Sequence, residues 1–151
     1  MVSFEPIGVV RNGIEKMSTG NWATVESVIE LGPEWVSGLA GLAEFSHLVV
    51  VFHLHRIPAF DRETQLLRRP RGMEHLDAVG VFAQRTKFRP NPIGVTPVRL
   101  VKIDANRLVV TGLDAMDGSP VFDIKPFIPE FDSVGEVRQP SWVSAMVKGY
   151  F

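Results

Sequence analysis

Two aspartates beside a predicted turn are candidates for binding a ligand. They lie in segment 113–126, LDAMDGSPVFDIKP, where Asp117-Gly118 is a turn signal that follows a predicted strand. Asp114 and Asp117 can therefore present two carboxylates side by side at the end of a sheet. Carboxylates there suit a ligand with an ammonium, a sulfonium or ribose hydroxyls. Aspartates that bond backbone amides within turns are also common and would explain either residue alone.

Segment 80–94, GVFAQRTKFRPNPIG, is the second candidate. Its two prolines fix φ and push the residues before them out of the helical conformation, so we expect a stiff extended connector. Arg85 and Arg89 carry guanidiniums that can bind a carboxylate or phosphate at two points, and Asn91 can both donate and accept. The alternative is a structural turn between two strands. Lys125 is likewise either a paired surface lysine or a substrate contact.

Three histidines, His47, His53 and His55, fall on one face of a predicted strand because side chains alternate along strands. His53 and His55 would be neighbours, as in metal-binding barrels. A metal site needs a third ligand, and the sequence offers none, so we predict no metal and expect a histidine placed for hydrogen bonding. Motifs of serine hydrolases and zinc proteases do not occur.

The basic residues are unevenly distributed. The net charge is −1, but segment 56–89 carries a net charge of +4 and the remainder −5. Such an asymmetry is typical of a face that meets phosphates. A solvated loop without a partner is the alternative.

The composition excludes several kinds of functional site and of protein. The 151 residues contain no cysteine, which excludes disulfides, zinc-thiolate sites and a cysteine nucleophile. The beginning of the chain lacks the pattern of an export signal, and the longest apolar run is far shorter than the roughly 20 residues that span a bilayer. We expect a cytoplasmic protein of one domain, residues 1–151, with no membrane association.

Short β-branched runs between glycines and prolines predict a mainly β fold. We expect strands near 5–11, 22–31, 46–55, 78–84, 94–103, 107–113 and 121–124, and short helices at 33–42 and 141–148. Without regular helices between strands, a barrel or sandwich is favoured over a parallel sheet. No glycine-rich phosphate loop is present, so a nucleotide-like ligand must be held in another way.

Five motifs together resemble the TrmO family of tRNA methyltransferases, also called TsaA-like or YaeB-like. They are segment 4–8, segment 41–47 followed by His55-Arg56, segment 80–85, segment 89–94 and segment 117–126. In this order and spacing they cover nearly the whole chain up to about Asp132.

The resemblance implies a single-sheeted β-barrel with one or two short helices, which dimerises and binds S-adenosylmethionine near the subunit interface. It also implies methylation of the 6-amino nitrogen of threonylcarbamoyladenosine beside the tRNA anticodon. S-adenosylmethionine has no phosphates, which agrees with the missing glycine loop, whereas tRNA would supply phosphates to the basic segment.

The resemblance also assigns residues. The cofactor site would be lined by His55, Arg56, Arg85, the backbone around Val95, and the acidic turn Asp114, Ala115, Met116 and Asp117. Arg89, Asn91 and Lys125 would serve the substrate or the structure. For direct in-line methyl transfer, Asp117 or His55 would be the base that takes the proton from the acceptor nitrogen.

Two features depart from the family pattern. Lys16 to Gly20 replaces a Pro-Arg-Gln segment that contacts the cofactor in the family, and we expect no separate C-terminal tRNA-binding domain. Two alternatives follow: a methyltransferase acting on a non-tRNA acceptor, or a non-catalytic ligand- or metal-binding barrel.

Overall fold

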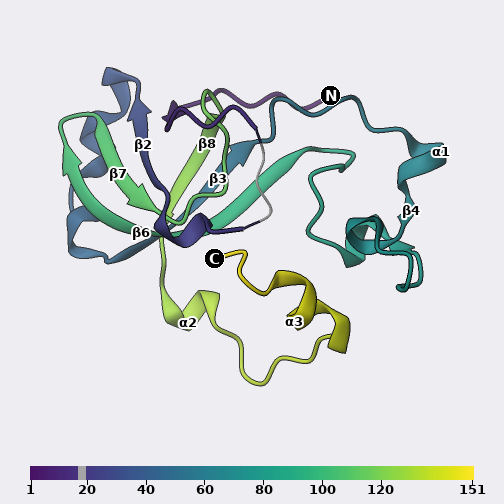
Figure 1. The fold of residues 1–151 in the computed structure, drawn as a ribbon. Helices are drawn as coiled ribbons and strands as arrows, with labels where there is room; N and C mark the ends of the chain where they lie inside the picture. Colours follow the sequence, from purple (N-terminus) through teal and green to yellow (C-terminus); the bar gives the residue numbers. More distant parts are fainter. Residues whose placement is uncertain (17–19) are drawn as a thin grey trace.

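A closed antiparallel β-barrel forms the body of the molecule. The computed structural model describes residues 1–16 and 20–151. The strands pair around the barrel in the order β1-β2-β7-β6-β3-β8 (Figure 1). Their bounds are β1 Gly8–Arg11, β2 Glu26–Leu31, β3 His47–His53, β6 Ile93–Asp104, β7 Arg107–Thr111 and β8 Pro120–Pro126. This confirms the predicted single-sheeted barrel.

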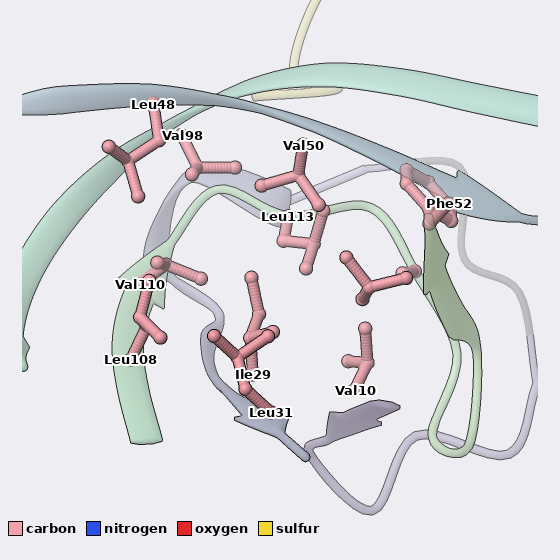
Figure 2. Close-up of a cluster of buried hydrophobic side chains, with 12 residues drawn as sticks. Val10, Ile29, Leu31, Leu48, Val50, Phe52, Val98, Leu108, Val110 and Leu113 are labelled. Atoms are coloured by element: carbon pink, nitrogen blue, oxygen red, sulfur yellow. The ribbon is translucent and has the colours of Figure 1, made fainter. Parts of the chain in front are cut away.

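The interior of the barrel is filled mainly by apolar side chains, and the alternation is clearest in β3. In β3, Leu48, Val50 and Phe52 are at most 1% exposed, whereas the residues between them are less buried. Figure 2 shows that these side chains meet others from the surrounding strands, including Val10, in one cluster. Burial of this shared apolar face stabilises the closed barrel.

One of the two predicted helices is an α-helix in the structure, and the other is replaced by two 3-10 helices. Segment 141–148 contains the α-helix α3, Ser141–Val147, as predicted. Segment 33–42 instead holds a 3-10 helix, Pro33–Leu39, followed by a second at Leu42–Glu44. Gly41 has φ +83 and separates them. A glycine in the left-handed region interrupts a right-handed helix, which the apolar spacing alone did not reveal.

An excursion, residues 54–92, connects β3 to β6 and extends to one side of the barrel (Figure 1). It contains α1, Arg62–Gln65, and a small sheet of β4, Leu67–Arg68, with β5, Val79–Gly80. The strand predicted at 78–84 is therefore only two residues long. The 3-10 helix Val81–Ala83 follows directly, since the backbone N–H of Gln84 donates to the Val81 carbonyl.

The two N-terminal strands begin later than predicted. The 3-10 helix Trp22–Thr24 precedes β2, and Asn21 before it has φ +63. Trp22 is 1% exposed. The chain ends with α2, Pro129–Asp132, and then α3. In the part of the chain that the structure describes, no helix has the length and apolar character needed to cross a membrane.

Candidate functional site

The acidic turn 114–117 follows β7 and leads through Gly118 into β8. The Asp117 Oδ1 atom accepts hydrogen bonds from the backbone N–H of Asn12 at 2.8 Å and of Gly13 at 3.1 Å. These two bonds, and to a smaller extent the charges of Arg11 and Arg56, lower the pKa of Asp117 below its usual range. Asp117 is therefore an ionised, firmly held carboxylate at neutral pH.

His55 and Arg56 lie against this turn, just beyond the end of β3. The His55 Nδ1 atom is 3.2 Å from the Ser119 hydroxyl, and its Nε2 atom is 3.6 Å from the position that a Cβ on Gly118 would occupy. Arg56 donates to the Glu15 carbonyl at 3.4 Å. The structure thus brings His55, Arg56 and Asp117 together.

The environment of His55 favours its neutral form. Burial is the main cause of its lowered pKa, and the positive charges of Arg56 and His53 act in the same direction. Asp117 opposes this shift with a smaller effect. The imidazole is therefore uncharged at neutral pH and retains a lone pair that can take up a proton.

Asp114, at the other end of the turn, is held by two hydroxyl groups. The Thr96 hydroxyl of β6 donates to Oδ1 and the Tyr150 hydroxyl donates to Oδ2, each at 2.5 Å. Ala115 and Met116 between the aspartates are buried. Both carboxylates are only partly buried, so they remain available to a ligand.

The arginine-bearing connector meets the turn at the beginning of β6. The guanidinium of Arg85 donates to the Val95 carbonyl at 2.9 Å. Val95 precedes Thr96, which bonds Asp114. Arg85 and Asp114 also both act on the ionisation of Tyr150, in opposite directions. Arg85, Val95 and Asp114 therefore lie in one neighbourhood, where the connector meets the acidic turn.

The three residues predicted to serve the substrate or the structure each have different surroundings. Arg89 donates to the carbonyls of Val81 at 3.2 Å and Gln84 at 2.6 Å, so it stabilises the conformation of the connector. Asn91 is exposed immediately before β6. The Lys125 ammonium pairs with Asp123 at 2.7 Å on β8, opposite Val49, and is not brought to the acidic turn.

His53 packs in a ring stack with Phe122, at 6.0 Å between centroids. Among the described residues, no three histidine, aspartate or glutamate side chains gather as metal ligands would. His47 lies at the opposite end of β3 and contacts the Ser46 hydroxyl at 2.7 Å. The histidine face therefore does not provide a metal centre within the part of the chain that is described.

Two residues of this neighbourhood escaped the sequence analysis. The Asn12 amide donates to the Ala115 carbonyl at 2.8 Å and to the Ser27 hydroxyl at 3.0 Å, joining the turn to β2. The Asn12-Gly13 dipeptide after a strand was a usable turn signal. Tyr150 had no local signal. The family-divergent segment Lys16 to Gly20 cannot be placed as a whole, because residues 17–19 lie outside the described residues.

Two shallow hollows lie elsewhere on the barrel. One is bordered by segments 43–46 and 100–103, the other by segments 6–9 and 30–34 with Asn106. Neither includes a residue of the acidic turn or the connector. We place the candidate site at the acidic turn because paired carboxylates, a neutral imidazole and two guanidiniums converge there. Such a surface suits a ligand that carries a cation, a carboxylate and hydroxyl groups.

Comparisons with known proteins identify the family to which the chain is similar. The sequence profile of the tRNA-methyltransferase O N-terminal domain matches residues 14–133. A probable S-adenosyl-L-methionine-binding protein of Methanothermobacter thermautotrophicus is 40% identical over 89% of this chain and 96% of its own length. The human tRNA (adenine(37)-N6)-methyltransferase is 35% identical over 68% of this chain and 22% of its own length.

The fold has close structural relatives. The crystal structure of TrmO from Pseudomonas aeruginosa has a TM-score of 0.73 and 33% identity, covering 94% of this chain. The chain spans 62% of that TrmO chain, so it corresponds to the greater part of it but not to all of it. Because the matched profile extends over most of the chain and the barrel is shared, this protein belongs to the TrmO family.

Proposed function

We propose that the protein is an S-adenosylmethionine-dependent tRNA methyltransferase that methylates the 6-amino nitrogen of threonylcarbamoyladenosine next to the anticodon. The observation that carries the proposal is the meeting of the acidic turn with Arg85 and His55 at one end of a TrmO-type barrel. The names of the relatives support both the cofactor and the tRNA acceptor.

The charged groups of the site fit S-adenosylmethionine. When bound, this cofactor supplies a methyl group activated by a positively charged sulfur. The partly buried carboxylates of Asp114 and Asp117 suit its ribose hydroxyls and its positive charges. Arg85 and Arg56 are both exposed and suit its carboxylate. Holding these groups in fixed positions is the protein's main contribution to an in-line transfer.

His55 is the better of the two candidate bases. The acceptor nitrogen loses a proton during transfer, and the base must be unprotonated yet basic enough to take it. Asp117 meets the first condition, but the two backbone N–H groups that stabilise its charge make it a weak base. His55 is neutral at neutral pH because of burial and neighbouring cations. We therefore assign Asp117 to binding and His55 to proton transfer.

The exposed residues around the site bear on two partners, a second copy of the chain and tRNA. We propose that the protein is cytoplasmic, in keeping with a tRNA acceptor. We also propose a homodimer with the cofactor site near its interface, because Val95 beside Arg85 is 43% exposed and Ile93 on the same strand is 38% exposed. An apolar strip next to a polar site is what a second copy would cover. Several basic groups of the excursion, including Arg62 and Arg68, are exposed and suit tRNA phosphates.

Methyl transfer to defined tRNAs tests this function. The protein is incubated with radiolabelled S-adenosylmethionine and tRNA with or without the threonylcarbamoyl group, and nucleosides are separated and identified by mass spectrometry. We expect label only in the threonylcarbamoyladenosine of the modified tRNA. Equal labelling of both tRNAs would rule out this substrate, and no labelling by a protein that binds the cofactor would indicate another acceptor.

A further inference from the structure

The C-terminal end of the chain returns to the part of the barrel that carries the acidic turn (Figure 1). The backbone N–H groups of Asn21 and Trp22 donate to the carbonyls of Gly149 and Tyr150, each at 2.9 Å. These paired bonds fix the backbone of residues 149–150 after α3. The Tyr150 side chain is thereby held at a defined position.

The Tyr150 hydroxyl is directed at Asp114. It donates to Oδ2 at 2.5 Å, while Thr96 donates to Oδ1 at the same distance. The Arg71 guanidinium lies 5.7 Å from the centre of the Tyr150 ring. Burial, with the bond to Asp114 as the next cause, raises the pKa of Tyr150 well above its usual value. The phenol therefore remains a donor at physiological pH.

Two donors on one carboxylate fix its orientation. With one oxygen bound from β6 and the other from the C-terminal segment, rotation of the Asp114 carboxylate would break both bonds. Each oxygen still has a lone pair for a ligand, because a carboxylate offers about four acceptor positions. A carboxylate held in this way is preorganised to accept hydrogen bonds from ribose hydroxyls.

We propose that Tyr150 is a positioning residue of the cofactor site, whose hydroxyl orients Asp114 toward S-adenosylmethionine. This inference rests on the proposed function and adds the C-terminal segment to the site. Loss of the hydroxyl leaves Asp114 Oδ2 without its protein donor, so the carboxylate gains freedom that cofactor binding must then remove. The expected defect is in cofactor binding and not in the transfer step.

The first test compares Tyr150→Phe with Phe151→Leu. Phe151 packs edge-on against Tyr150 at 4.7 Å and makes a matched control in the same segment. We expect Tyr150→Phe to raise the KM for S-adenosylmethionine by about tenfold, the effect of one hydrogen bond to a charged group, with kcat changed less than about twofold. Phe151→Leu should leave the KM within about twofold. An unchanged KM in Tyr150→Phe would overturn the inference.

A second test leaves the hydrogen bond to Asp114 intact. Tyr150 is the only tyrosine in the chain, so incorporation of 3-fluorotyrosine gives a single fluorine resonance from this residue. We expect that resonance to shift when S-adenosylmethionine saturates the protein. A stationary resonance in a protein that binds the cofactor by calorimetry overturns the role of Tyr150 alone. A protein that binds no cofactor overturns the proposed function as well.

Discussion

The titrating residues of the site have separate electrostatic roles. Asp117 is stabilised in its charged form by backbone N–H groups, whereas His55 is stabilised in its neutral form by burial. The pKa values of both residues are lowered. At pH 7, Asp117 is therefore charged and the His55 imidazole is unprotonated. Such a pair can combine binding of a cationic ligand with removal of a proton.

Replacing His55 tests its assignment as the base. In the wild-type protein, kcat should be constant at neutral and alkaline pH and should fall as pH decreases through the pKa of His55, which lies below the ordinary value of 6.5. The value of kcat falls toward low pH because only the neutral imidazole can accept a proton. In His55→Gln, kcat should drop by about 10² to 10⁴ and the acid limb should disappear. A pH profile of methyl transfer measures both, and an identical acid limb in the variant would contradict the assignment.

Single residues were predictable only where the signal was local. Asp114, Asp117 and Gly118 fall within one short turn, and the sequence identified that turn directly. Asn12 and Tyr150 bond to the same turn from 103 and 36 positions away, respectively. No spacing rule connects residues at such distances, because the barrel brings them together only after it has closed.

At the level of elements, the junction of β3 and β6 determines where the connector enters the barrel. Gly94 pairs with Phe52 across these strands. The Phe52 ring, 1% exposed, lies against the Gly94 backbone where any Cβ would collide with it. This close approach requires glycine and fixes the start of β6, from which Val95 and Thr96 reach the site.

A methyl group at Gly94 should therefore destabilise the barrel. Gly94→Ala forces the buried Phe52 ring to move, and we expect a loss of about 1–3 kcal/mol in the free energy of unfolding. Gly38→Ala is the control, since a Cβ there meets no atom within 4 Å, and it should change stability by less than about 0.5 kcal/mol. Denaturant unfolding compares the two variants. Equal stabilities would contradict the role given to Gly94.

Strands of the barrel were predictable, whereas the excursion was not. Alternate positions are buried in β3 and around Thr96 and Val98 of β6, so the sequence pattern of these strands reflects the packing of the barrel. In the excursion, local hydrogen bonds from a side chain to backbone carbonyls take the place of that packing. Arg69 donates to the carbonyls of Glu74 and Leu76 at 2.5 and 2.7 Å, which holds a loop with no periodic pattern.

At the scale of the whole molecule, charge separates the excursion from the remainder of the protein. Segment 56–89 is net positive in a chain whose overall charge is −1. Figure 1 shows this excursion extending away from the barrel, which leaves it open to a large partner. A polyanion would therefore be attracted to one side of the molecule, next to the arginine-bearing connector.

Salt dependence of tRNA binding tests this surface. Arg62→Ala together with Arg68→Ala removes two exposed charges of the excursion, and we expect the slope of log affinity against log salt to fall by about 0.7–0.9 for each phosphate that the variant no longer neutralises. Arg107→Ala is the matched control, because this arginine pairs loosely with Glu30 at 3.9 Å on β7 and β2. Equal slopes for all three proteins would show that tRNA binds elsewhere.

Calorimetric titration with S-adenosylmethionine tests whether the acidic turn forms the cofactor site. Asp117→Ala removes a carboxylate held by two backbone N–H groups, whereas Lys125→Ala removes an exposed charge from the following strand. We predict saturable binding to the wild-type protein, unchanged affinity in Lys125→Ala, and affinity at least about tenfold weaker in Asp117→Ala. Wild-type affinity in Asp117→Ala would contradict the account.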